Sequence, residues 1–317
     1  MRRILVTGAL GQIGSELIVK LREKYGAENV IATNRSKKEG HDAVYNGGPF
    51  ELLDIRDKER TIELVEKYNI NTIINLAAIL SAVGEQRPLD CWDINMNGLY
   101  NMLEIARERN IMLFNPSSIA AFGPSTPPDM TPQDTIQRPT TMYGVTKVAG
   151  EILCDYYHQR FDTDTRGVRF PGLISYETLP GGGTTDYAVH IYYEAIKNKK
   201  YTSFIKEGTQ MDMMYMPDAL DAIVELMEAD GDKLIHRNAF NITAMSFTPE
   251  EIAASIKKYI PEFEMDYDVD PVRQAIAESW PNSLDASAAK EEWGFSPKYD
   301  LDAMTRDMLD KLSKKLK

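Results

Sequence analysis

The sequence has few of the residues that build disulfide frameworks and metal sites. Its 317 residues include two cysteines and four histidines, and none of them stands at the spacing of a metal-binding motif. Cys91 and Cys154 are far apart in the chain and are expected to be buried thiols. No apolar run approaches the roughly 20 residues that cross a bilayer, and residues 1–6 are too short for a signal peptide. We therefore expect a cytoplasmic protein without a metal site or a membrane partner.

Positive charge is also scarce, because 48 acidic residues outnumber 36 basic ones and give a formal net charge of −12. A surface of this sign repels the phosphates of nucleic acids, so nucleic acid is not an expected partner. The composition is 43% hydrophobic and has no low-complexity tract, which is typical of a folded globular protein with a large core.

Short apolar runs alternate with amphipathic stretches through the first half of the chain. The apolar runs predict buried strands at residues 4–6, 30–33, 72–76, 111–115 and 167–170. The amphipathic stretches predict helices at residues 13–25, 56–68, 94–109 and 143–160. This alternation predicts an α/β fold with a parallel, doubly wound sheet of the Rossmann type.

The alternation of apolar runs and amphipathic stretches ends after Phe170, where prolines and glycines divide the chain into shorter pieces. The run Thr248–Glu251 has the threonine, proline and glutamate of a capped helix start, and this helix is expected to end at Tyr259. We predict a dinucleotide-binding domain over residues 1–170 and a smaller, mainly substrate-binding region over residues 171–317. Later segments are expected to return to the first domain.

The first expected strand leads into a glycine loop at the start of a helix. Gly8 would permit a tight turn, Gly11 would let the backbone approach a pyrophosphate, and Gly14 would let helix and strand pack closely. Gln12 and Ile13 stand at the helix start, where free N–H groups suit an anion. The loop, with its neighbouring strand and helix, predicts a dinucleotide site.

The end of the second expected strand leaves the type of dinucleotide open. An acidic residue usually holds the adenosine ribose there, but this chain has Asn34 and Arg35. Asn34 would bond a ribose hydroxyl without repelling a 2′-phosphate, and Arg35 would attract one. We favour NAD over NADP. Asp54 and Ile55 are expected at the adenine edge.

A phenol and an ammonium share one face of an expected helix, because Tyr143 and Lys147 are four residues apart. A phenol with a pKa of about 10 is a poor base at neutral pH, but a nearby ammonium and a bound oxidised nicotinamide lower that pKa. Ser118 follows the fourth expected strand, at the edge where such sheets bind ligands. Tyr193 and Lys197 have the same spacing without such a serine. The first set therefore predicts hydride chemistry on a nicotinamide cofactor.

These motifs resemble those of the extended short-chain dehydrogenases, and the resemblance spans the whole chain. It rests on the glycine loop, Ser118, the Tyr143/Lys147 pair and the runs at residues 75–78, 116–123 and 169–172. It implies that Ser118 donates a hydrogen bond to the reacting oxygen, Tyr143 is the catalytic base and Lys147 binds the nicotinamide ribose. Asn95 would support the active-site helix. The further cofactor contacts implied are Leu76, Ala77, Ala78, Asn95, Phe170, Gly172, Leu173 and Ile174.

The segment at residues 180–189 distinguishes between substrates within this family. Dehydratases place acidic residues after the serine, where this chain has Ile119 and Ala120. Epimerases usually neutralise a substrate diphosphate with basic residues in the second domain, and residues 180–189 carry none. Their hydroxyls, backbone N–H groups and single carboxylate favour a small zwitterion, with a nucleotide-sugar 4-epimerase as the alternative.

The runs at residues 80–82, 171–175, 180–189 and 279–281 closely resemble those of short-chain enzymes that act on L-threonine. The resemblance implies oxidation of the threonine β-hydroxyl to 2-amino-3-oxobutyrate with hydride transfer to NAD. The expected substrate contacts are Ser81, Ser118, Tyr143, Thr184, Thr185, Asp186 and Trp280. Asp186 is equally expected as a helix cap and Trp280 as a packed aromatic.

The resemblance also implies a homodimer. Members of the family commonly pair through the helices that correspond to residues 94–109 and 143–160. The apolar spacing of these helices permits such an interface, although the same stripe would face the sheet of a monomer.

Overall fold

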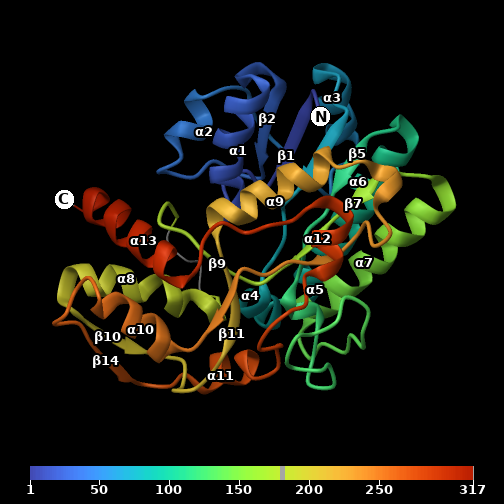
Figure 1. The fold of residues 1–317 in the computed structure, drawn as a ribbon. Helices are drawn as coiled ribbons and strands as arrows, with labels where there is room; N and C mark the ends of the chain where they lie inside the picture. The colour runs from blue at the N-terminus through green and yellow to red at the C-terminus, as the bar shows by residue number, and fades with distance from the viewer. Residues whose placement is uncertain (179–182, 317) are drawn as a thin grey trace.

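The computed structural model describes residues 1–178 and 183–316, and its centre is a six-stranded parallel sheet (Figure 1). The sheet has the order β3-β2-β1-β4-β5-β7. Its strands are β1 (Ile4–Thr7), β2 (Val30–Asn34), β3 (Phe50–Leu52), β4 (Thr72–Asn75), β5 (Met112–Phe114) and β7 (Thr165–Arg166). The chain reverses its direction of winding between β1 and β4, so the predicted doubly wound α/β fold is confirmed.

Helices cover both faces of this sheet. The helices in contact with the strands on one face or the other are α1 (Gln12–Tyr25), α2 (Asp42–Asn46), α3 (Lys58–Tyr68), α6 (Gly98–Arg109), α7 (Met142–Phe161) and α9 (Met216–Glu228). Ile4 and Val6 pack in one core with α1 and α9, whereas Leu5 packs in another with α3, α6 and α7. This alternation is the reason why the strands are apolar throughout. No helix in the described ranges is long and apolar enough to cross a membrane.

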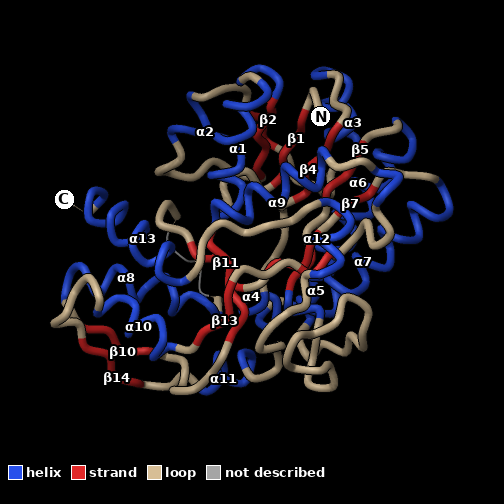
Figure 2. The backbone as a smooth tube through the Cα atoms, in the orientation of Figure 1, coloured by secondary structure: helices blue, strands red, loops and turns tan. Residues whose placement is uncertain are grey.

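A second lobe has its own core, below and to the left of the sheet in Figure 1. Its strands form one sheet of β9 (Gly172–Ile174), β11 (Met211–Tyr215) and β13 (Met245–Phe247), and another of β10 (Lys200–Ser203) and β14 (Glu264–Tyr267). Its helices are α8 (Tyr187–Asn198), α10 (Pro249–Lys257), α11 (Pro271–Ala277) and α13 (Leu301–Lys315). Figure 2 shows these short strands between helices and long loops.

The remaining helices and strands belong to neither group. They are α4 (Ser81–Gln86), α5 (Pro88–Trp92), the π-helical segment η2 (Asp93–Asn97), β6 (Ser117–Ser118), β8 (Val168–Phe170), β12 (Phe240–Asn241) and α12 (Ser287–Trp293). Of these, β8, β12 and α12 pack in the core around β1 and α1. Four 3-10 turns complete the described elements: η1 (Ala27–Asn29), η3 (Ile119–Ala121), η4 (Thr184–Asp186) and η5 (Gly231–Lys233).

Three elements differ from the sequence-based expectations. The strand expected at residues 167–170 forms as β8, but it pairs with β6 and β12 rather than within the six-stranded sheet. The break falls at Gly167, where a Cβ would lie 2.5 Å from the carbonyl oxygen of Asn115. The helix expected at residues 94–109 begins earlier, because α5 and η2 lead directly into α6. The helix that Thr248 and Glu251 cap ends at Lys257.

Segments of the second half pack against the first. α9 packs against α1, and residues 286–295 join the core around β1 and α1. The division of the chain near residue 170 stays a prediction.

Gly8 offers a test of how strictly the first turn depends on glycine. It has φ +64°, and a Cβ there would lie 2.8 Å from the backbone of Leu76 and Ala77. We expect Gly8→Ala to lower the free energy of unfolding by about 3 kcal/mol or more, because it adds a backbone clash to a left-handed conformation. Denaturant unfolding monitored by circular dichroism measures this change.

Gly208 is the matched control. It has φ +75°, but no atom of the described residues lies within 4 Å of the position that a Cβ would take there. Gly208→Ala should therefore cost only the conformational term of about 1–2 kcal/mol. Equal losses in the two variants would contradict the steric argument.

Candidate active site

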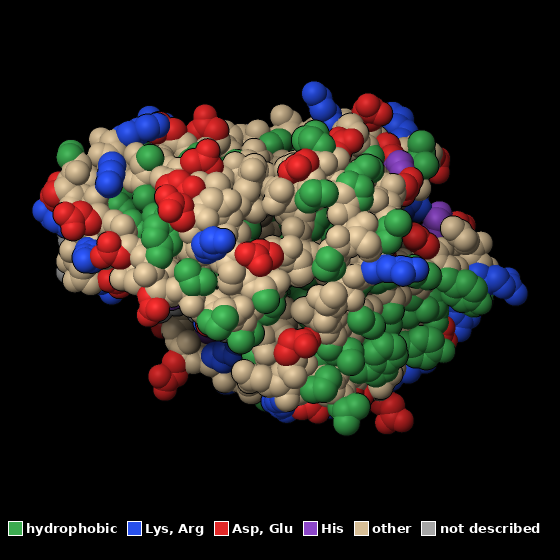
Figure 3. Space-filling model, turned by 90° about the horizontal axis from the view of Figure 1, so that it is seen from below, with side chains coloured by type: hydrophobic (Ala, Val, Ile, Leu, Met, Phe, Trp, Pro, Cys, Tyr) green, Lys and Arg blue, Asp and Glu red, His purple; other side chains and the backbone are tan. Residues whose placement is uncertain are grey.

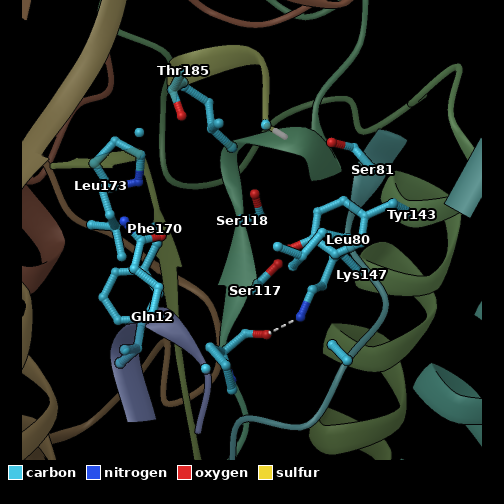
Figure 4. A pocket seen from close by; sticks show the side chains of 18 of the residues that line it. Gln12, Leu80, Ser81, Ser117, Ser118, Tyr143, Lys147, Phe170, Leu173 and Thr185 are labelled. Atoms are coloured by element: carbon cyan, nitrogen blue, oxygen red, sulfur yellow. Dashed lines mark hydrogen bonds between the residues drawn. The ribbon is translucent and has the colours of Figure 1, made fainter. Parts of the chain in front are cut away.

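A cavity of about 260 Å³ opens where the carboxyl ends of β1 and β4 meet the second lobe (Figure 4). Most of the residues predicted from the sequence line it: Gly8, Gly11, Gln12, Ile13, Gly14, Leu76, Ala78, Ser81, Ser118, Tyr143, Lys147, Phe170, Gly172, Leu173, Thr184, Thr185, Asp186 and Trp280. The fold thus brings segments from both halves of the chain to one place. Part of the predicted substrate segment, residues 180–182, lies outside the described residues.

The glycine loop forms the entrance to α1. The Gly11 N–H donates to the Gly8 carbonyl at 2.9 Å, and a Cβ on Gly14 would lie 2.4 Å from that same oxygen. Gly11 is the N-cap of α1 and has no side chain, so the first N–H groups of the helix receive no capping hydrogen bond from it. These features fit the pyrophosphate of a dinucleotide.

Ser118, Tyr143 and Lys147 lie side by side on one wall (Figure 4). Thr141 caps α7 by accepting the Gly144 N–H at 3.1 Å, which fixes the first turn where Tyr143 stands. The Ser118 Oγ accepts the Ala120 N–H at 3.2 Å, and Ser118 lines the cavity beside Tyr143. The Lys147 Nζ donates to the Pro116 carbonyl at 2.7 Å and lies 5.3 Å from the centre of the Tyr143 ring.

Burial controls the protonation of this group. It raises the pKa of Tyr143 to about 12, and the nearby Ser118 only partly opposes this shift. Burial also lowers the pKa of Lys147 to about 8, while the charge of Glu151 opposes that shift. The expected lowering of the Tyr143 pKa is therefore wrong for the protein alone, because desolvation of the phenolate is the largest influence on it.

Asn95 connects elements around the site by hydrogen bonds. Its Oδ1 accepts the Ile79 N–H at 2.8 Å, and its Nδ2 donates to the Ile79 carbonyl and the Thr146 hydroxyl, each at 3.0 Å. It thereby ties η2 to α7 and to the loop after β4. Ala77 and Asn95 line a smaller pocket beside Lys147 rather than the main cavity.

Five other predicted cofactor residues lie away from the main cavity. The Asn34 Nδ2 donates to the Ser36 carbonyl at 2.8 Å, and Arg35 is exposed. Asp54 forms a salt bridge with Arg56 at 2.7 Å, which lowers the pKa of its carboxyl. The remaining two, Ile55 and Ile174, are buried in the cores. The roles of all five stay predictions.

The substrate end of the cavity has two residues with double roles. The Gly183 N–H donates to the Asp186 carboxylate, so Asp186 caps η4 while it lines the cavity. Trp280 packs against the two buried clusters that contain Tyr143 and Leu284, and it also lines the cavity. Asp186 is therefore a helix cap and Trp280 a packed aromatic, and both also line the cavity.

Several lining residues had no predicted role in the sequence. They are Leu80, Pro116, Ser117, Ile119, Pro171 and Gly183. All except Pro116 are direct neighbours in the chain of residues that were predicted, and Pro116 lies two residues before Ser118. For those that follow β4, β5 and β8, this position is the signal that identifies them, since ligands bind at the carboxyl ends of parallel strands.

Comparisons with known proteins agree with this geometry. A relative from Staphylococcus saprophyticus, named an uncharacterized epimerase/dehydratase, is 59% identical over all of this chain and 99% of its own length. The solved L-threonine dehydrogenase from Clostridium difficile is 68% identical with a TM-score of 0.98, covering 99% of this chain and 98% of that one. A monomeric L-threonine 3-dehydrogenase from a metagenome is 45% identical with a TM-score of 0.93, covering 99% of this chain and all of that one.

The family whose model matches is described as the NAD dependent epimerase/dehydratase family, and the match covers residues 4–243. This confirms the resemblance to the extended short-chain dehydrogenases. The chain belongs to the NAD dependent epimerase/dehydratase family.

Proposed function

We propose that this protein is an NAD-dependent L-threonine 3-dehydrogenase, which oxidises the β-hydroxyl of L-threonine to 2-amino-3-oxobutyrate. One observation carries the proposal. A single cavity joins a dinucleotide loop to Ser118, Tyr143 and Lys147, in a chain that is 68% identical to a solved L-threonine dehydrogenase. In this proposal, residues 1–170 hold the cofactor and residues 171–317 mainly hold the substrate, in a cytoplasmic enzyme.

In this proposal, each group of residues in the cavity has its own role in binding or catalysis. NAD, when bound, accepts the hydride from the β-carbon of the substrate. The N-terminus of α1 and its glycine loop bind the pyrophosphate, and Lys147 binds the nicotinamide ribose. Ser118 orients the substrate hydroxyl by a hydrogen bond, and Tyr143 removes its proton. Ser81, Thr184, Thr185 and Asp186 hold the carboxylate and ammonium of threonine, and Trp280 excludes water.

The charge of the cavity favours a small zwitterion over a nucleotide sugar. A nucleotide-sugar 4-epimerase needs cations for the diphosphate of its substrate as well as a site for its cofactor. Lys147 is the one cation that lines the cavity in the part of the chain that the structure describes. Asp186, which also lines the cavity, would repel a diphosphate and attract an ammonium.

The direct test is an assay of L-threonine oxidation with NAD and with NADP side by side. We expect threonine-dependent reduction of NAD, measured by near-ultraviolet absorbance. Tyr143→Phe should lower kcat by at least about 100-fold, because the variant lacks the phenol that takes the proton, while NAD binding measured by calorimetry stays nearly unchanged.

Tyr193→Phe is the control for this assay. Lys197 lies 5.7 Å from the Tyr193 ring, so the pair repeats the same spacing outside the cavity. This variant should turn over threonine like the wild type. A Tyr143→Phe enzyme with wild-type kcat would refute the proposed base.

The ionisation of Tyr143 should depend on the cofactor. Without NAD its pKa is about 12, so the phenol keeps its proton up to about pH 10. Bound oxidised nicotinamide is cationic and should lower that pKa, so that the phenolate forms at lower pH. Ultraviolet difference spectra between the wild type and Tyr143→Phe, titrated with and without NAD, measure both ionisations. Identical titrations would contradict the electrostatic role of the cofactor.

We also propose a homodimer that pairs through α5, α6 and α7. Large apolar side chains on these helices are exposed, including Leu89 at 84%, Ile152 at 61% and Tyr156 at 51%. Figure 3 has a broad hydrophobic area on the side of the molecule where α7 lies. A contiguous exposed apolar area of this kind is typical of an interface.

Ile152→Glu should convert this dimer to a monomer, because a charge would be buried in an apolar interface. Light scattering coupled to gel filtration measures the mass. Ile235→Glu is the matched control, since Ile235 is also exposed, at 83%, but lies outside these helices. A monomeric wild type would contradict the proposal.

A further inference from the structure

A buried carboxylate lies directly behind the proposed catalytic group. Glu151 stands on α7, one turn after Lys147, and is 6% exposed. It accepts hydrogen bonds from the Ser117 hydroxyl, from the Gln137 Nε2 at 2.7 Å and from the Arg169 Nη2 at 2.9 Å. A second bond from the Arg169 Nε, at 3.1 Å, makes this ion pair bidentate.

The partners of Glu151 belong to the elements that carry the site. Ser117 lies on β6 between Pro116, the acceptor of the Lys147 ammonium, and Ser118. Arg169 lies on β8, next to Phe170, which lines the cavity. One carboxylate therefore joins α7, β6 and β8 from the side away from the cavity.

Glu151 is also the carboxylate that acts on the charge of Lys147. The ammonium is buried, and its hydrogen bond goes to an uncharged acceptor, the Pro116 carbonyl. Burial lowers the pKa of Lys147 to about 8, and the charge of Glu151 is the largest opposing influence. The other titratable groups that face it are Tyr143 on α7, Cys154 on α7 and Cys91 on α5. Burial raises the pKa of all three, so they are uncharged at neutral pH.

We propose that Glu151 is a positioning residue that keeps Lys147 protonated at neutral pH and holds the Ser117–Ser118 strand against α7. The importance of this for catalysis rests on the proposed function, in which Lys147 binds the nicotinamide ribose. The effect on the charge of Lys147 does not, because it is a property of the protein without cofactor or substrate.

A titration of Lys147 in the cofactor-free protein tests the proposal. The Cε resonance of the side chain, in protein with ¹³C-labelled lysine and assigned with Lys147→Met, reports its protonation. We expect a midpoint near pH 8 in the wild type and a clearly lower one in Glu151→Gln, because the opposing carboxylate is lost. A midpoint unchanged in a folded Glu151→Gln protein would overturn the proposal and leave Glu151 as a structural ion pair.

Asp155→Asn is the control on the same helix. Asp155 stands one turn beyond Glu151, and its carboxylate accepts from the Asn238 Nδ2 at 2.9 Å. Removing its charge should leave the Lys147 midpoint almost unchanged. A shift as large as that of Glu151→Gln would show a general field effect and would overturn the specific role.

A second variant covers the case in which Glu151→Gln does not fold because Arg169 is left buried and unpaired. Glu151→Gln with Arg169→Gln removes both charges, and it should still have a lower Lys147 midpoint than the wild type. Glu151 stands one turn from Lys147 on the same helix, whereas Arg169 stands on β8. A midpoint at the wild-type value would overturn the proposal.

Activity provides the second readout. In Glu151→Gln the decline of kcat at high pH should begin at lower pH, since the ammonium is lost earlier. Each unit of displacement changes the ratio of ammonium to amine about tenfold. A protein without threonine oxidation in any form refutes the proposed function, but the titration of Lys147 still decides the role of Glu151.

Discussion

The site depends on the burial of an ionisable pair. Tyr143 and Lys147 are both removed from water, and desolvation favours the neutral form of each. In the protein without cofactor, burial therefore keeps the Tyr143 phenol protonated and lowers the pKa of the Lys147 ammonium. A cation bound in the cavity would favour the phenolate of Tyr143, because charge acts more strongly in a low-dielectric site than in water. In the proposed mechanism, cofactor binding and activation of the proposed base would therefore be one electrostatic event.

The topology of the sheet is what makes such burial feasible. The chain changes its direction of winding between β1 and β4, and the carboxyl ends of the strands there leave a crevice that the second lobe closes. Backbone groups supply some of the hydrogen-bond partners that buried polar side chains need there. The Pro116 carbonyl, for example, accepts a hydrogen bond from the Lys147 Nζ. Asn95 and Glu151 supply further hydrogen bonds and charge from behind, so the reactive side chains have few conformations available.

The local features of the site could be predicted from the sequence, whereas its long-range contacts could not. The glycine loop needs only a strand, a turn and a helix, and the spacing of Tyr143 and Lys147 needs only one helical turn. The pairing of β8 with β6 and β12 depends on contacts with residues far away in the chain. Glu151 carried a local signal, one turn after Lys147, but its partner Arg169 lies on another element. The pKa of Tyr143 is raised because its side chain is buried. A short sequence motif does not show whether a side chain is buried.

Asp186 illustrates how a framework role is compatible with the binding role that we propose for it. Its carboxylate accepts the Gly183 N–H and so fixes the start of η4 at the rim of the cavity. A carboxylate has about four lone-pair sites, so a backbone hydrogen bond does not exclude an ammonium ligand. The cap holds the side chain in one orientation before any ligand arrives, so less conformational entropy is lost when a ligand binds. A residue that fixes its own loop is therefore better placed to recognise a small zwitterion than one that swings freely in solvent.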